Sequence, residues 1–161
     1  YLFNSSMLIL ALSYFLFYVS YLRIQLSFNK NKILNFLSFT TILISLISFV
    51  LVAVFSADTS TFDAHIFFVK AAFRLLLIHC FIQFLIVYNS KLSKRILISS
   101  SLFCIVLFLF IIVMEYGPSP FKDNRSLFIQ VTSQKVVVIS ILIYFFVQVS
   151  ESISLSKKYN S

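Results

Sequence analysis

The sequence predicts an all-α integral membrane protein, a bundle of five transmembrane helices in a single domain that covers residues 1–161. Three observations lead to this prediction. Hydrophobic residues make up 60% of the chain, whereas soluble domains contain about 45–50%. Charged residues make up only 11%, against about 25% in a soluble domain. The apolar residues also fall into five runs, each close to the length of about 20 residues that a membrane-spanning helix needs.

Polar turns set the limits of these five runs. The predicted spans cover residues 2–22, 33–56, 66–88, 96–114 and 127–149. The single glycine, Gly117, and both prolines lie in the connection between the fourth and fifth runs. Because no span contains Gly or Pro, we expect unbroken helices that pack through Phe, Leu, Ile, Ser and Ala side chains.

The charged residues alternate between successive connections. Basic residues without acids follow the first and third spans, whereas the connection after the second span is acidic and the one after the fourth is balanced. The positive-inside rule then places the N-terminus outside and the C-terminus in the cytoplasm, or in the matrix of a mitochondrion. We expect a bacterial inner membrane, with the mitochondrial inner membrane as the alternative. The net charge of +8 is explained by this topology, so we expect no nucleic-acid partner.

The sequence contains no pattern typical of an enzyme. It has no His-Glu-x-x-His motif, no Gly-rich phosphate loop and no paired carboxylates within a span. Cys80 and Cys104 lie within apolar runs and are interpreted as small packing residues. We therefore predict that the chain is not an enzyme, and that it holds neither a cofactor nor a metal ion.

The third span carries most of the ionisable side chains that lie within the predicted membrane segments. Lys70 and Arg74 share one helical face, and His79 lies on the opposite face. Arg74 is about 12 Å inside the span, where a charge costs at least ~2.5–3.5 kcal/mol. Arg74 therefore needs a partner, and Glu115 at the outer end of the fourth span is the expected one. We interpret His79 as a hydrogen-bonded core histidine.

The fifth span has a polar outer half that ends in Lys135. If the third and fifth spans are neighbours, Lys70, Arg74 and Lys135 converge on an outward-facing cationic site. Such a site suits a carboxylate or a phosphate. The alternative is a purely structural role, in which Arg74 joins helices and Lys70 extends to the membrane surface.

The segment Phe67-Phe68-Val69-Lys70-Ala71-Ala72-Phe73 opens the third span. This spacing, together with Tyr88 before the basic turn, resembles the N-terminal membrane input region of bacterial histidine kinases and nucleotide cyclases. The resemblance covers about 95 residues. That family usually has seven spans and often contains Trp, whereas this chain has five predicted spans and no Trp. The resemblance implies a sensory role.

Two functions are consistent with the sequence. The first is a membrane-embedded sensory or signal-transducing module with a ligand site at Lys70, Arg74 and Lys135. The second is a non-catalytic accessory or structural subunit of a larger membrane protein complex. Both imply the lipid bilayer as a partner, together with other membrane protein subunits or a second copy of the chain.

Overall fold

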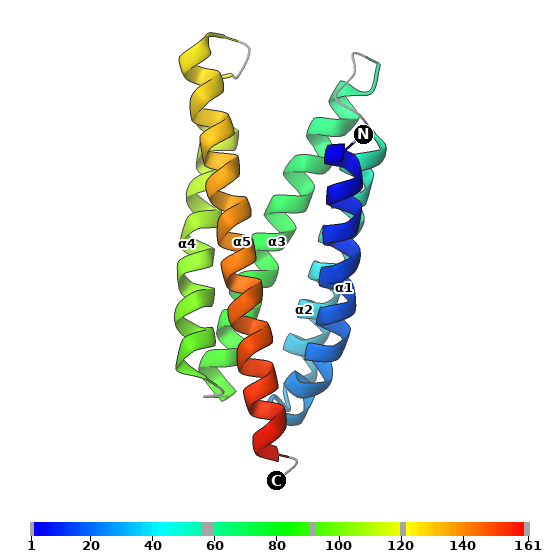
Figure 1. Ribbon diagram of the computed structural model, residues 1–161, viewed down its shortest axis with the longest axis vertical. Coiled ribbons are helices and arrows are strands. Elements are labelled where there is room, and N and C mark those ends of the chain that lie inside the picture. The colour runs from blue at the N-terminus through cyan, green and yellow to red at the C-terminus, as the bar shows by residue number, and fades with distance from the viewer. Residues whose placement is uncertain (1, 56–59, 91–92, 120–121, 160–161) are drawn as a thin grey trace. The chain divides into compact units, whose positions relative to one another are not determined.

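The computed structural model describes residues 2–55, 60–90, 93–119 and 122–159. These residues form five α-helices and no strand: α1 (Leu2–Phe28), α2 (Lys32–Val54), α3 (Phe62–Ser90), α4 (Lys94–Tyr116) and α5 (Asn124–Tyr159) (Figure 1). The helices α2, α3, α4 and α5 are each long and apolar enough to cross a membrane. The prediction of an all-α membrane protein is confirmed to that extent.

Several helix ends differ from the predicted spans: α1 continues to Phe28, six residues beyond the predicted end at residue 22, and α3 begins four residues before the predicted start at residue 66. The second span was predicted to reach residue 56, but α2 ends at Val54 because Phe55 takes an extended conformation, with φ −85° and ψ 96°. Ser56 lies outside the described residues. In contrast, α5 continues to Tyr159, ten residues beyond the predicted end of the fifth span at residue 149. Apolar length predicts where a helix leaves the membrane, whereas the helix itself continues through any residues compatible with its hydrogen bonds.

Three of the helix starts are capped by side chains. The side-chain oxygen of Asn31 (Oδ1) accepts from the backbone N–H of Leu34 at the start of α2, and the Ser93 hydroxyl accepts from the backbone N–H of Ile96 at the start of α4. At the start of α5 the Asp123 carboxylate accepts from the Ser126 N–H at 2.7 Å. That hydrogen bond lowers the pKa of Asp123, because it stabilises the charged form. The caps satisfy N–H groups that a helix start leaves without partners.

The chain divides into two compact units, one of residues 1–90 and one of residues 91–161. In the first unit α2 packs against both α1 and α3. The Ser45 hydroxyl of α2 donates to the backbone carbonyl of Ala72 in α3 at 2.9 Å, and neither residue is exposed. Ser48 is buried as well. These contacts confirm the expectation that small Ser and Ala side chains occupy helix contacts.

The second unit is the antiparallel hairpin of α4 and α5. The rings of Phe103 and Tyr144 stack with centroids 4.8 Å apart, and both side chains are buried. Near the connection between the two helices, the side-chain amide of Gln130 in α5 donates to the backbone carbonyl oxygens of Val113 at 3.1 Å and Pro118 at 3.2 Å. Gln130 therefore holds the end of α4 and the connection after it against α5.

Gly117 follows α4 at the point where these hydrogen bonds form. A Cβ at this position would lie 2.2 Å from the Val113 carbonyl oxygen and 3.2 Å from Gln130 Nε2. Because the nearer atom belongs to the backbone, the end of α4 has to shift to admit a side chain.

We expect Gly117→Ala to lower the free energy of unfolding by about 1–2 kcal/mol, through loss of the Gln130 contacts and local strain. Thermal unfolding in detergent measures the change, and Ser119→Ala, at an exposed position of the same connection, is the control. If both variants melt at the wild-type temperature, Gly117 has no packing role.

Candidate functional site

The candidate site is a group of buried polar side chains that joins the three helices of the first unit. Each of these side chains is at most 9% exposed. They are Tyr18 and Gln25 in α1, Asn29 directly after α1, Asn35 and Ser38 in α2, and His79 and Gln83 in α3. We refer to these seven residues as the polar network. Burying polar groups among apolar helices costs free energy, and the hydrogen bonds within the polar network compensate for that cost.

His79 lies at one end of the polar network. Its Nδ1 is 3.0 Å from the backbone carbonyl oxygen of Ser38 and 3.2 Å from the Ser38 hydroxyl. A carbonyl oxygen only accepts, so Nδ1 carries the hydrogen and Nε2 is left as an acceptor. The Tyr18 ring packs edge-on against the imidazole, with centroids 5.1 Å apart. His79 is thus a hydrogen-bonded core histidine, as the sequence predicted.

Gln83 lies at the centre of the polar network. Its amide nitrogen is 2.7 Å from the Ser38 hydroxyl, 2.8 Å from the Tyr18 hydroxyl and 2.9 Å from Gln25 Oε1. The amide has two hydrogens for these three oxygens. Gln25 Oε1 only accepts and takes one, so the two hydroxyl groups, themselves 2.7 Å apart, share the other. One side chain of α3 therefore joins both α1 and α2.

The orientation of the amides is fixed by backbone groups at the turn between α1 and α2. Asn29 Oδ1 accepts from the Asn31 N–H at 3.1 Å, so its Nδ2 is the donor to Asn35 Oδ1 at 2.9 Å. The Asn35 Nδ2 donates to the Asn29 carbonyl at 2.8 Å. Gln25 Nε2 must then donate to Asn35 Oδ1, at 2.9 Å, and present its own oxygen to Gln83. From donor to acceptor, the hydrogen bonds thus run from Gln83 in the interior through Gln25 to Asn35 near the turn, where Asn35 Oδ1 also accepts from Asn29.

Two acceptors of the polar network have no partner among the described residues: His79 Nε2 and Gln83 Oε1. Both belong to α3, one helical turn apart, and both side chains are fully buried. A buried acceptor without a hydrogen bond costs about 1–3 kcal/mol. In each of these two side chains the nitrogen that donates is therefore hydrogen-bonded, whereas the remaining acceptor is not.

The predicted cationic residues lie in both units. Lys70 is half-buried and Arg74 is exposed on α3 of the first unit. Lys135 is exposed on α5, and Glu115 is half-buried near the end of α4, both in the second unit. The predicted convergence of the three cations, and the pairing of Arg74 with Glu115, are relations between the units and stay predictions.

Sequence reasoning missed most of the polar network. Gln25 and Asn35 lie three residues before the end of α1 and three residues after the start of α2, on either side of a short turn. In an antiparallel helix pair such positions lie at the same depth, and this symmetry was a signal that could have identified the pair. Nothing in the sequence indicates that Gln83 of α3 reaches them.

A second polar group, also missed, joins α4 to α5. The Ser93 hydroxyl donates to Glu151 Oε2 at 2.6 Å, and Arg95 Nη1 lies 3.3 Å from Glu151 Oε1. One helical turn earlier in α5, the Gln148 amide donates to the Tyr144 hydroxyl at 2.7 Å. Because Ser93 also caps α4, Glu151 couples the start of α4 to the part of α5 that continues beyond the predicted span.

Comparison with known proteins gives no relative for this chain. No protein-family model matches it, and no curated protein or solved structure shows significant similarity to it. The functional argument therefore depends on the geometry described above.

Proposed function

We propose that this protein is a membrane-embedded sensory or signal-transducing module with an outward-facing cationic site at Lys70, Arg74 and Lys135. The observation that carries the proposal is the polar network, with its two unsatisfied acceptors on α3. In this proposal a rotation or shift of α3 breaks the present hydrogen bonds of His79 and Gln83 and moves their two unsatisfied acceptors to new surroundings. Packed elements of this kind favour discrete arrangements over gradual deformation.

The positions along α3 connect the proposed site to this element. Arg74 lies five residues before His79, so a ligand held at Arg74 acts on the same rigid helix. A phosphate or carboxylate suits this position, since a guanidinium binds either with two parallel hydrogen bonds. The sequence around Lys70, similar to the input regions of histidine kinases and nucleotide cyclases, supports the same role.

The length of α5 suits an output element. Its 36 residues extend about 54 Å at 1.5 Å per residue, against a hydrocarbon core of about 30 Å. A helix that leaves the membrane without a break transmits a shift or rotation to whatever it contacts in the cytoplasm. In the proposed arrangement Lys135 of the same helix is the contact with the ligand.

We further propose that α1 is the fifth span and that the N-terminus lies outside, in a bacterial inner membrane or, as the alternative, the mitochondrial inner membrane. The 27 residues of α1 extend about 40 Å, enough to cross. Single cysteines at the exposed positions Ser60 and Lys30, in a chain lacking Cys80 and Cys104, test the orientation. An impermeant thiol reagent is expected to label position 60 in intact cells and to spare position 30; the reverse pattern contradicts the topology.

The ligand site is tested with Arg74→Gln in the full chain, reconstituted in lipid nanodiscs. Inorganic phosphate and succinate are the probes, and melting temperature is the readout. We expect at least one anion to raise the wild-type melting temperature, and the Gln variant to lose that response while melting close to wild type without anion. Arg23→Gln is the control, because it changes an exposed arginine near the C-terminal end of α1, outside the proposed site. This variant should respond to the anions like the wild type.

Two results contradict the sensory site. In one, neither anion affects the wild-type protein. In the other, Arg74→Gln lowers the melting temperature and leaves the anion response unchanged, which assigns Arg74 a structural role. Purification in mild detergent then tests the accessory-subunit alternative, because a subunit elutes in a large complex of constant composition and a sensor as a small oligomer.

A further inference from the structure

One side of α5 faces away from α4. Gln130 and Tyr144 contact α4, and at 100° per residue Lys135 lies about 140° and about 180° around the helix from them. Six residues on this opposite side follow one another at steps of four and three, and all six are exposed: Phe128, Thr132, Lys135, Ile139, Leu142 and Phe146. We refer to these six residues as the α5 stripe.

The α5 stripe has the geometry of a helix-packing surface. From its first to its last residue it extends about 27 Å, close to the hydrocarbon thickness of about 30 Å. Alternating steps of four and three keep a row of side chains facing one neighbouring helix, as in left-handed coiled coils, and most transmembrane bundles cross with that hand. Thr132 and Lys135 are the polar members of an otherwise apolar row.

Lys135 lies deep within the predicted fifth span. It is about 10.5 Å along the helix from Phe128, the first residue of the α5 stripe. A lysine side chain extends about 6 Å and leans toward the N-terminus of its helix, so the ammonium group does not reach that end of the stripe. A charge at this depth is costly unless a partner compensates it. Among the described residues, Lys135 forms neither an ion pair nor a hydrogen bond.

A second unused donor lies one helical turn from Lys135. The hydroxyl groups of Ser133 and Ser140 donate to backbone carbonyls of their own helix at 2.8 Å. The Thr132 hydroxyl, in contrast, forms no hydrogen bond with the described part of the chain. Thr132 and Lys135 therefore present two donors at one level of the α5 stripe, and a carboxylate has enough lone pairs to accept from both.

A carboxylate at this depth does not come from the predicted spans of this chain. All the acidic residues lie outside those spans: Asp58, Asp63, Glu115, Asp123 and Glu151. Glu151 is also engaged by the Ser93 hydroxyl. A second copy does not supply a carboxylate either, because a symmetric contact along the α5 stripe places Lys135 opposite Lys135, and like charges repel.

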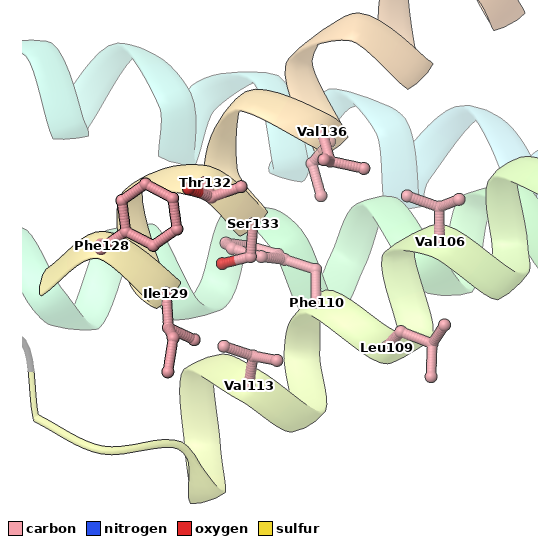
Figure 2. Close-up of a pocket in the computed structure, with 10 residues that line it drawn as sticks. Val106, Leu109, Phe110, Val113, Phe128, Ile129, Thr132, Ser133 and Val136 are labelled. Atoms are coloured by element: carbon pink, nitrogen blue, oxygen red, sulfur yellow. The ribbon is translucent and has the colours of Figure 1, made fainter. Parts of the chain in front are cut away.

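An apolar groove borders the α5 stripe. Figure 2 shows Phe128 and Thr132 of α5 on one side of this groove and Leu109 and Val113 of α4 on the other. Its volume is about 390 Å³. Phe128 and Thr132 belong to both the stripe and the groove, so a helix packed along the stripe has room for a bulky apolar side chain beside Thr132.

From this stripe, its two unused donors and the absence of acidic residues from the predicted spans, we infer that α5 docks a transmembrane helix of a different protein. That helix carries one Asp or Glu side chain at the depth of Lys135 and an apolar side chain in the groove beside Thr132. The site uses the second unit alone, so the inference does not rest on the proposed sensory function. Where both hold, the carboxylate of the docked helix is the anion that Lys135 binds.

The probe that tests this inference is a synthetic transmembrane peptide of leucine and alanine, about 23 residues long, with one glutamate at its midpoint. The full chain, lacking Cys80 and Cys104, carries a donor dye on Ser119→Cys, at an exposed position before α5, and the peptide carries an acceptor dye. Energy transfer in phosphatidylcholine vesicles gives the apparent affinity. We expect the Glu peptide to bind about tenfold more tightly than matched peptides with Gln or Leu at the midpoint, the ratio given by a strong hydrogen bond between model transmembrane helices.

The matched control exchanges two adjacent residues of α5. Gln134→Lys together with Lys135→Gln keeps the composition and moves the ammonium group by 100° around the helix, away from the α5 stripe. We expect this exchange variant to bind the Glu and Gln peptides alike. Lys135→Arg should retain the preference, and Thr132→Val should lower it by about threefold, the effect of one average hydrogen bond between helices. Circular dichroism verifies that each variant is helical.

Three results overturn the inference. Equal affinity of the Glu, Gln and Leu peptides for the wild type means that the α5 stripe does not recognise a carboxylate. A preference for the Glu peptide that survives in the exchange variant assigns the contact to other cations of the chain. Energy transfer between donor-labelled and acceptor-labelled copies of the chain that exceeds transfer to the Glu peptide, and that Lys135→Leu abolishes, assigns the stripe to a second copy.

Discussion

Replacing Ala72 with leucine is expected to lower the free energy of unfolding by about 3 kcal/mol, the upper end of the range for adding side-chain volume to a packed interior. Ala72 has no exposed surface, and its carbonyl accepts from Ser45 at 2.9 Å. The backbone of α3 is therefore within hydrogen-bonding reach of a side chain of α2. The extra carbon atoms either separate the two helices or force the leucine into a strained rotamer.

Ala71→Leu is the matched control for this prediction, because it makes the same change at the adjacent residue, where the side chain is half-buried. We expect it to change the stability by less than about 0.5 kcal/mol. Unfolding in a detergent mixture with increasing denaturing detergent gives both values. Similar losses in the two variants would contradict a close approach of α2 and α3 at Ala72.

Gln83→Leu is expected to destabilise the first unit by about 2 kcal/mol. Hydrogen bonds between side chains in membrane proteins contribute about 0.6 kcal/mol on average, and Gln83 makes three such contacts. Gln25 Oε1 is left buried without a donor, but the substitution also removes the unsatisfied Gln83 Oε1, so these two penalties largely cancel. Leucine has a similar volume, so the formation of a cavity contributes little.

The exposed Gln134 of α5 provides the matched control, because Gln134→Leu makes the same chemical change outside the polar network. We expect this variant to unfold like the wild type. Pairing Gln83→Leu with Gln25→Leu adds a stronger test. The double variant should be more stable than the sum of the two single losses predicts, since removing both partners leaves no unsatisfied amide between them. Simple additivity would contradict the contact between Gln25 and Gln83.

The sequence by itself determined the class of the protein and much of its local structure. Apolar runs separated by polar turns predict helices, because a chain in a bilayer has to satisfy its backbone hydrogen bonds internally. Asn31 and Ser93 precede apolar runs, and each caps the helix that follows. The opposite placement of His79 and Arg74 on α3 follows from helical periodicity alone, and the structure buries the first and exposes the second.

Only the tertiary structure decided which polar side chains meet. Periodicity gives the face of a helix on which Gln83 lies, but it gives neither the neighbouring helix nor the depth of the opposing residue. A hydrogen bond forms only when two atoms approach within about 3 Å, so a shift of one residue along either helix removes it. The contacts of Gln83 with Tyr18 and Gln25, and of Glu151 with Ser93, join residues that are 58 to 65 positions apart in the chain. They exist because the packing of small and apolar side chains sets the relative height of the helices, and that packing depends on the whole unit rather than on any local pattern.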